Sequence, residues 1–312
     1  MRGMLRSAAV LAGTVGGLSG AAYGMLIRQT RSAQRVLEIP GWMPLRADGV
    51  YLPDASGPVP PSELFADVDV LTLAVLGDSS AAGLGVDTPD QLPGVLLARG
   101  LAEESGRPVQ LDTHAISGST SQRLAGQLDT ALVNPPDAAL IMVGANDVKV
   151  RILPSTSAAL LGAAVASLRA AGAAVVVGTC PDLGAIRPIP QPLRSVVRSW
   201  SLTLARLQRE AVLRAGGHPV ALADLLTPEF LAQPDALFSR DRLHPSAAGY
   251  EATCSVLLPA LCSALGVWGG GPPPHAPVRS APTDARRWTT RITASADRGL
   301  RRVTGYVAGV RP

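Results

Sequence analysis

The chain has 312 residues, of which 47% are hydrophobic and 17% are charged, so it can bury a substantial core and is not a disordered protein. Its formal charge of +4 is unevenly distributed. Residues 1–38 carry five arginines and one acidic residue, and residues 269–312 carry eight arginines and two acidic residues, which leaves −6 for the body between them. An acidic body is not expected to bind nucleic acid.

Residues 1–35 are predicted to be a signal anchor or a signal peptide. Ser7 to Ile27 is an uncharged run of 21 residues, long enough to span a bilayer, whereas the core of a signal peptide needs only about 7 to 15 apolar residues. A retained anchor is favoured over an export signal cleaved near Gly20-Ala21-Ala22, and a soluble helix is the third interpretation. We therefore expect the protein in the cell membrane or exported to the cell envelope.

The rest of the chain divides into three parts. Residues 36–69 contain six prolines and are expected to be a linker or a strap on the body. Residues 70–268 form one domain, because apolar runs alternate with helical patterns; residues 269–312 are a flexible tail rich in proline, glycine and arginine. The apolar runs lie at 70–76, 109–113, 138–143, 173–178 and 220–223, and the helices near 92–105, 120–132, 156–171, 192–215 and 246–264. This pattern predicts a three-layer αβα domain of the α/β class with a mostly parallel five-stranded sheet.

A serine follows the first predicted strand, in the turn Gly77-Asp78-Ser79-Ser80. Open α/β sheets bind their ligands at the carboxyl edge of the strands, so the hydroxyl of Ser79 is a candidate nucleophile. Taken alone, this is a common turn composition. Its interpretation depends on whether later strands supply a base, an acid and oxyanion donors.

The candidate base and acid lie in Asp241-Arg242-Leu243-His244, just before the last helix. An aspartate three residues before a histidine can accept a hydrogen bond from the imidazole, which fixes its tautomer and leaves the other nitrogen free to take a proton from Ser79. The structural alternative is a helix start with Ser246 as the N-cap. The position after the last predicted strand favours the catalytic interpretation.

Two further stretches lie at strand ends. Asn146, in Gly144-Ala145-Asn146-Asp147, offers an amide to a developing oxyanion, and Gly118, after the second strand, lets a backbone N–H approach a substrate without a Cβ in the way. Either stretch could instead be a simple βα turn. Together with Ser79 and His244 they place polar groups at four strand ends.

These stretches resemble the blocks of the SGNH hydrolases, also called GDSL esterases and lipases, over about residues 70–265. The resemblance implies the flavodoxin-like SGNH fold. It also implies a Ser79, Asp241 and His244 triad and an oxyanion hole made by Ser79, Gly118 and Asn146. Two positions depart from the family pattern: Ser80 replaces the leucine of GDSL, and Arg242 stands where a small residue is frequent.

The sequence predicts neither a cofactor nor a metal. Gly83-Leu84-Gly85 lacks the third glycine of a dinucleotide fingerprint, and Cys180, Cys254 and Cys262 have no metal-type spacing. The sequence contains no Gly-x-Ser-x-Gly elbow, which argues against an α/β-hydrolase. The proline-rich stretch 180–193 is a candidate wall of the substrate pocket, and 87–93 is a similar candidate near Ser79.

The function expected from the sequence is therefore that of a serine esterase. It would hydrolyse a carboxylic ester through an acyl-enzyme, with a small-molecule, lipid or polysaccharide ester as substrate. The alternative from another class is a membrane-anchored binding or scaffold protein that keeps the fold without turnover.

Overall fold

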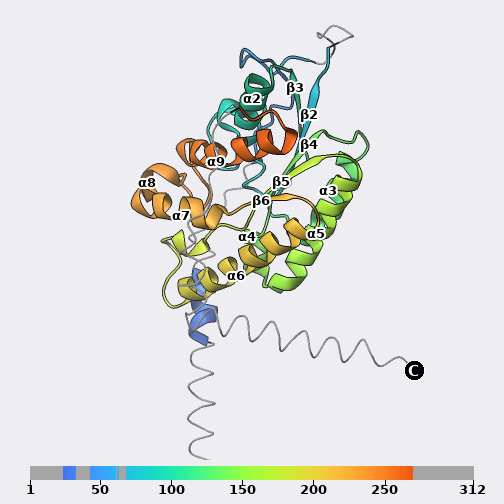
Figure 1. The fold of residues 1–312 in the computed structure, drawn as a ribbon. Coiled ribbons are helices and arrows are strands. Elements are labelled where there is room, and N and C mark those ends of the chain that lie inside the picture. The colour runs from blue at the N-terminus through green and yellow to red at the C-terminus, as the bar shows by residue number, and fades with distance from the viewer. Residues whose placement is uncertain (1–23, 33–42, 61, 63–67, 270–312) are drawn as a thin grey trace, which may run out of the picture.

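A mixed six-stranded sheet forms the centre of the molecule in a computed structural model, which describes residues 24–32, 43–60, 62 and 68–269 (Figure 1). The strand order is β1-β3-β2-β4-β5-β6, with the last five strands parallel and β1 antiparallel to β3. The strands are β1 (Gly49–Tyr51), β2 (Leu71–Gly77), β3 (Val109–Thr113), β4 (Ala138–Met142), β5 (Ala174–Gly178) and β6 (His218–Val220).

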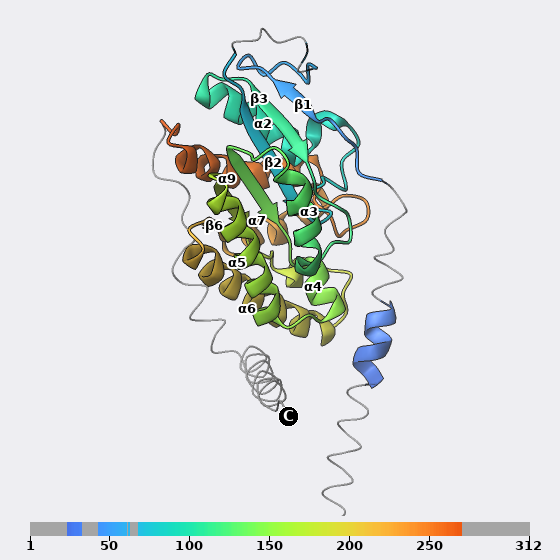
Figure 2. The same ribbon diagram turned by 90° about the vertical axis from the view of Figure 1, so that its right-hand side faces the viewer.

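Helices cover both faces of this sheet, as the two views in Figures 1 and 2 show. Alternate residues of β2 point to opposite faces, so Leu73 and Val75 join the core under α2 and α9, whereas Leu76 joins the core under α3, α5 and α6. The helices are α2 (Pro93–Ser105), α3 (Leu124–Ala131), α4 (Ala145–Val150), α5 (Pro154–Ala170), α6 (Leu193–Arg214), α7 (Leu222–Ala232), α8 (Pro234–Leu237) and α9 (Ala247–Leu265). The result is the three-layer αβα arrangement expected from the sequence.

The sheet differs from the expected one in two places. It has six strands rather than five, because the proline-rich segment supplies the edge strand β1. The prediction of the last strand at 220–223 was also wrong, because β6 ends at Val220 and α7 begins at Leu222. Three-residue strands carry too little periodicity to be recognised, and α7 is apolar enough to look like the continuation of a buried strand.

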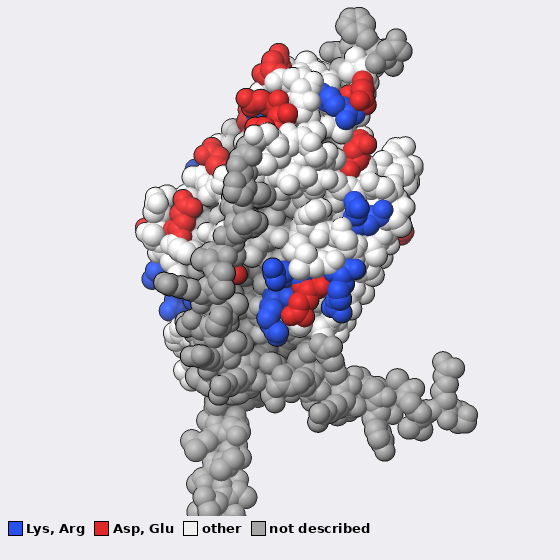
Figure 3. Space-filling model, viewed as in Figure 1, with Lys and Arg blue, Asp and Glu red and all other residues white. Residues whose placement is uncertain are grey.

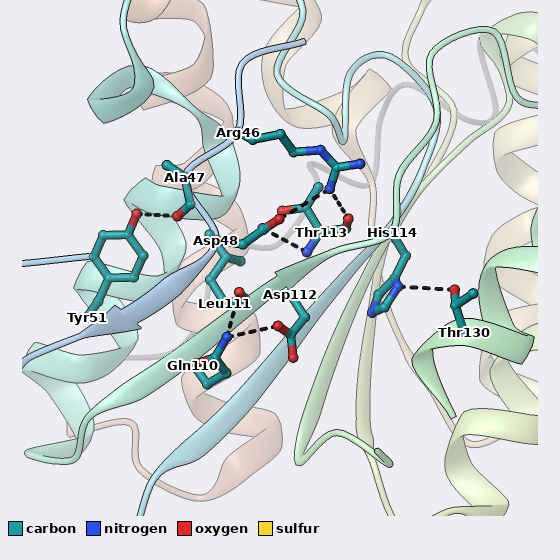
Figure 4. Close-up of polar contacts among 10 residues, drawn as sticks. All are labelled: Arg46, Ala47, Asp48, Tyr51, Gln110, Leu111, Asp112, Thr113, His114 and Thr130. Carbon is teal, nitrogen blue, oxygen red and sulfur yellow. Dashed lines mark hydrogen bonds and ion pairs between the residues drawn. The ribbon is translucent and has the colours of Figure 1, made fainter. Parts of the chain in front are cut away.

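Polar side chains hold β1 against β3 (Figure 4). Asp48 accepts a hydrogen bond from the backbone N–H of Thr113 at 2.9 Å, and Arg46 both pairs with Asp48 and donates to the carbonyl of Thr113. Inside the fold, the hydroxyl of Tyr51 donates to the carbonyl of Ala47 at 2.6 Å. These contacts use charged groups at the edge of the sheet, where unpaired backbone groups would otherwise invite association with another strand.

A short helix at residues 24–32 lies against the amino-terminal end of α6. The side chain of Gln29 donates to the carbonyl of Gln191 at 2.6 Å and accepts from the N–H of Leu193 at 3.1 Å. Most of the predicted anchor, residues 7–23, lies outside the described residues, as does the tail from residue 270. Within the described part, one helix has the length and composition of a membrane span, and it is α9, a core helix with Tyr250, Leu257 and Leu261 fully buried.

Charged side chains of both signs are spread over the described surface in this view (Figure 3). Acidic groups are more numerous toward the top, where a basic group lies beside them, and toward the bottom an acidic patch lies between basic ones. Some of them pair, as Arg99 does with Asp90 at 2.7 Å and Arg206 with Glu210 at 3.7 Å. That the body does not bind nucleic acid stays a prediction.

Candidate active site

The turn that carries Ser79 begins at a glycine that no other residue could replace. Gly77 has φ +132°, and a Cβ there would lie 1.9 Å from the carbonyl oxygen of Met142 in the neighbouring strand. The close approach lets the N–H of Asp78 donate to that same carbonyl at 2.9 Å. The chain therefore leaves β2 in one defined direction, with Ser79 directly after the strand and 7% exposed.

The structure brings Ser79, His244 and Asp241 together. The Oγ of Ser79 lies 2.9 Å from Nε2 of His244, although the two residues are 165 positions apart. On the other side of the ring, Nδ1 lies 2.6 Å from Oδ2 of Asp241. With Nδ1 protonated toward the carboxylate, Nε2 is left as the acceptor for the serine hydroxyl.

Asp241 is held in its ionised form by a dense set of hydrogen bonds. Burial acts to raise the pKa of this carboxyl, but hydrogen bonds from the His244 ring and from the N–H groups of His244 and Leu243 outweigh it and hold the pKa well below the ordinary value. Its Oδ1 accepts from these two N–H groups at 2.9 and 2.8 Å and from the Ser239 hydroxyl at 2.8 Å. The carboxylate thus organises its own loop as well as the imidazole.

The loop of His244 and the turn of Ser79 meet closely because one residue there is a glycine. A Cβ on Gly85 would lie 2.5 Å from the carbonyl of Pro245 and 3.0 Å from Cβ of His244. The hydroxyl of Tyr250, on α9, donates to the carbonyl of Leu84 at 2.8 Å and fixes the same approach. Of the two glycines that looked like part of a dinucleotide fingerprint, Gly85 makes room for the histidine, whereas Gly83 packs against Leu92 and Pro93.

Two of the three predicted oxyanion donors, Asn146 and Gly118, are placed differently. Asn146 lies in the first turn of α4, lines the same cavity as Ser79, and donates one amide hydrogen to the carbonyl of Ser119 at 3.1 Å. Gly118 lies in a turn closed by a bond from the N–H of Ser119 to the carbonyl of Ile116, with φ +80°. Gly118 is not among the residues that line the cavity, so its role as a donor stays a prediction.

Two buried glutamines bind the strand ends, and sequence reasoning missed both. Gln127 of α3 accepts from the N–H of Gly77 at 2.7 Å and donates to its carbonyl at 2.9 Å and to the hydroxyl of Ser119 at 3.2 Å. Gln208 of α6 accepts from the N–H of Cys180 at 2.7 Å and donates to the carbonyl of Val143 at 2.9 Å. A single glutamine in an amphipathic helix gives no sequence signal, so both contacts emerge only from the fold.

Two buried aspartates were also missed as structural groups. Asp147 accepts hydrogen bonds from the N–H and hydroxyl of Ser121 and from the hydroxyl of Ser157, which ties α4 to the segment after Gly118. Asp78, next to Ser79, accepts from the N–H and hydroxyl of Ser80 at 3.0 and 2.7 Å. Burial raises the pKa of Asp78, and the bonds from Ser80 offset only part of this.

A cavity of about 720 Å³ opens beside Ser79 and His244. The segment 180–193 walls it as expected, through residues that include Leu183, Ile186 and Ile189. The segment 87–93 does not: Asp87 and Gln91 line a separate groove of about 1020 Å³ with Arg240 and Arg242. Within the described residues, no group of three or more His, Cys, Asp or Glu side chains could hold a metal ion.

The family model of GDSL-like lipases/acylhydrolases matches residues 75–252. The chain belongs to this family. A GDSL-like esterase from Mycobacterium tuberculosis is 45% identical over 270 residues, which cover 84% of this chain and 85% of that protein. The family resemblance expected from the sequence is thus confirmed, and the protein is a hydrolase that acts on ester bonds.

Solved structures show the same fold at low identity. A protein from Parabacteroides merdae described as a GDSL-like lipase has a TM-score of 0.50 at 16% identity, over 64% of this chain and 96% of that one. A variant of an acetyl xylan esterase from Geobacillus stearothermophilus has a TM-score of 0.48 at 20% identity, over 65% and 97% of the two chains. The first of these similarities establishes the fold and no more.

We predict that Gln127 positions the nucleophile. Gln127→Met keeps the length of the side chain but leaves both backbone groups of Gly77 without their carboxamide partner, so kcat for ester hydrolysis should fall about tenfold or more with little change in KM. Steady-state kinetics together with thermal unfolding would measure this. Gln208→Met is the matched control, since it removes the same kind of contact between Val143 and Cys180. Gln208→Met should lower the unfolding temperature about as much as Gln127→Met does, but it should lower kcat less. Equal losses of kcat in the two variants would contradict the prediction.

Proposed function

We propose that the protein is a serine esterase that hydrolyses a carboxylic ester through an acyl-enzyme on Ser79. The observation that carries the proposal is the chain of contacts from Ser79 through His244 to Asp241. Nε2 of His244 takes the hydroxyl proton as Oγ attacks the ester carbonyl carbon, and Asp241 stabilises the imidazolium that forms. His244 then gives the proton to the leaving alcohol.

Hydrolysis of the acyl-enzyme repeats these roles. A water molecule takes the place of the alcohol, and His244 removes its proton as the water oxygen attacks the acyl carbonyl carbon. His244 then returns the proton to Oγ of Ser79 as the bond between the acyl group and Ser79 breaks and the acid is released. In both halves the negative charge on the carbonyl oxygen needs donors already in place. We propose the backbone N–H groups of Ser79 and Gly118 and the amide of Asn146, which has one N–H beyond the bond to Ser119.

The function is tested by labelling the full-length chain with a fluorophosphonate and by hydrolysis of p-nitrophenyl esters. The wild type should label at one serine and turn over, and Ser79→Ala should lose both properties. Ser80→Ala is the matched control, because its hydroxyl is bonded to Asp78 rather than to a base, and it should still label. Failure of the wild type to label and to hydrolyse any ester would favour the non-catalytic scaffold, and a label that persists in Ser79→Ala would mean another nucleophile.

Removal of the Asn146 amide should slow the chemical step. Asn146→Ala is expected to lower kcat about a hundredfold or more, since one oxyanion donor contributes about 3 to 4 kcal/mol to transition-state stabilisation. KM should change little, because the charge on the carbonyl oxygen develops only in the transition state. Asn134→Ala, at an exposed position before two prolines, is the control. Wild-type turnover in Asn146→Ala would remove this residue from the oxyanion hole.

We also propose that residues 7–27 direct the protein to the membrane or export it to the envelope. The support is the length of the uncharged run, 21 residues, with arginines on both sides. Cell fractionation and N-terminal sequencing should find either the intact chain in the membrane fraction or a shortened chain outside the cytoplasm. Deletion of residues 2–22 should leave the chain in the cytoplasm. An intact full-length chain in the soluble cytoplasmic fraction would contradict the proposal.

A further inference from the structure

The segment between β5 and α6 lines two separate spaces. Leu183 and Ile186 face the cavity that holds Ser79, whereas Gly184 and Arg187 line a smaller pocket of about 240 Å³. Sites that enclose a whole drug-sized molecule have about 300 Å³ or more, so this pocket suits a single small group. Among the described residues that line it are three arginines, Arg187, Arg194 and Arg198, and no Asp or Glu. We call it the arginine pocket.

Two of these arginines are held in place by neutral groups. Nη1 of Arg194 donates to the carbonyl of Arg187 at 3.3 Å, and Nη2 of Arg187 donates to the carbonyl of Leu231 at 3.4 Å. A guanidinium has five N–H donors. Each of the two therefore keeps further N–H groups that a ligand can use.

The third arginine is balanced from inside the fold. Nη2 of Arg198 lies 3.2 Å from Oδ2 of Asp182, whose side chain is 1% exposed. A Cβ on Gly184 would lie 2.7 Å from Cβ of Arg198, so the glycine makes room for the arginine side chain. The carboxylate of Asp182 also accepts from the N–H of Gly184 at 2.8 Å. One of the three positive charges in the pocket thus has a buried counter-charge.

The charges of Arg187 and Arg194 have no such counterpart within the described residues. Most other paired arginines contact a carboxylate, as Arg99 and Arg206 do with Asp90 and Glu210. Arg194 and Arg198 are four residues apart on α6, a spacing at which like charges repel each other. Such a cluster is stabilised by an anion, and guanidinium groups bind phosphate oxygens in a bidentate manner.

The arginine pocket adjoins the helix of residues 24–32, which lies beside the start of α6 (Figure 1). Nε2 of Gln29 donates to the carbonyl of Gln191, a residue that lines the pocket, at 2.6 Å. Gln29 is only two residues beyond the end of the uncharged run at Ile27, which is about 3 Å along a helix. The headgroup layer on each side of a bilayer is about 5 to 7 Å thick. If residues 7–27 lie in a bilayer, the pocket is therefore at the level of the lipid phosphates.

We propose that Arg187, Arg194 and Arg198 form a phosphate-binding site, and that the phosphate belongs to the headgroup of an anionic phospholipid. The proposal rests on the proposed membrane localisation and not on the esterase chemistry. An anionic headgroup is favoured over a zwitterionic one, because Arg28 and Arg31 are exposed on the neighbouring helix and would repel a second positive charge. The bound lipid joins the segment before α6 to the membrane surface.

The phosphate site is tested with inorganic phosphate and the full-length chain in an uncharged detergent, at an ionic strength kept constant with sodium chloride. Phosphate at about tenfold its Kd should raise the unfolding temperature by about 3 to 6 °C. The double variant Arg187→Gln/Arg194→Gln should lose this rise, and each single variant should lose part of it. Arg198 is left unchanged, because it pairs with the buried Asp182 and its loss would also destabilise the fold.

Arg206→Gln is the matched control, since Arg206 lies on the same helix and pairs with Glu210. It should keep the full response to phosphate. An equal rise in the wild type and in the double variant would overturn the site.

The lipid source is tested with the full-length chain in nanodiscs of phosphatidylcholine, alone or with about one-third phosphatidylglycerol. Backbone amide hydrogen exchange over residues 184–198 should be about threefold slower or more in the phosphatidylglycerol discs. High salt should weaken this difference, and the double variant should lose it, whereas Arg206→Gln should keep it.

The outcomes separate the parts of the inference. A response to inorganic phosphate with equal exchange in the two kinds of disc would assign the site to free phosphate and overturn the lipid headgroup. No response to phosphate and no difference between the discs would overturn the site altogether. A chain that does not enter the discs would overturn the membrane localisation and the lipid headgroup together. Ester hydrolysis by Ser79 is judged by its own labelling experiment in every case.

Discussion

The close passage of Gly77 beside β4 is the constraint on which the site depends. A side chain at this position would overlap the carbonyl of Met142, so the backbone of β2 lies against its neighbour until its last residue and then turns sharply. The turn delivers Ser79 to the carboxyl edge of the sheet in one orientation. Gln127 of α3 binds both backbone groups of Gly77, so the position of Ser79 is set by buried contacts rather than by a surface loop.

Buried acidic groups near the nucleophile each have a different environment. Asp241 accepts bonds from the imidazole and from two N–H groups, which keeps it ionised and able to stabilise a charged His244. Asp147 accepts only from serine hydroxyls and one backbone N–H, and so joins three segments without a cation. Asp78 lies next to Ser79, yet burial raises its pKa. The carboxylate that contacts His244 is therefore Asp241, distant in sequence from Ser79, and not the adjacent Asp78.

Much of the fold and part of the site could be predicted from the sequence, because the central strands and one local contact leave a clear pattern in it. The strands β2, β4 and β5 are buried on both faces and appear as continuous apolar runs, and the spacing between Asp241 and His244 is local enough to foresee their contact. β1 is three residues long and is paired with β3 by its backbone and by contacts of Asp48 and Arg46 with Thr113, which no periodicity reveals. The glutamine contacts join residues 50 and 65 positions apart, so only the three-dimensional packing discloses them.

The segment between β5 and α6 lies outside the sheet that carries Ser79 and Asn146. The strand ends that carry Ser79 and Asn146 are fixed by close packing within the sheet, where a shift of one strand would disturb its neighbours. The wall built by residues 183–200 is not part of the sheet, and it meets the helix of residues 24–32 through two hydrogen bonds of a single side chain, Gln29. Changes in that wall would alter the volume beside Ser79 without moving the triad. The contacts of Ser79 with His244 and Asp241 thus depend on the rigid sheet, and the volume beside them depends on a wall that joins residues 24–32 to the cavity.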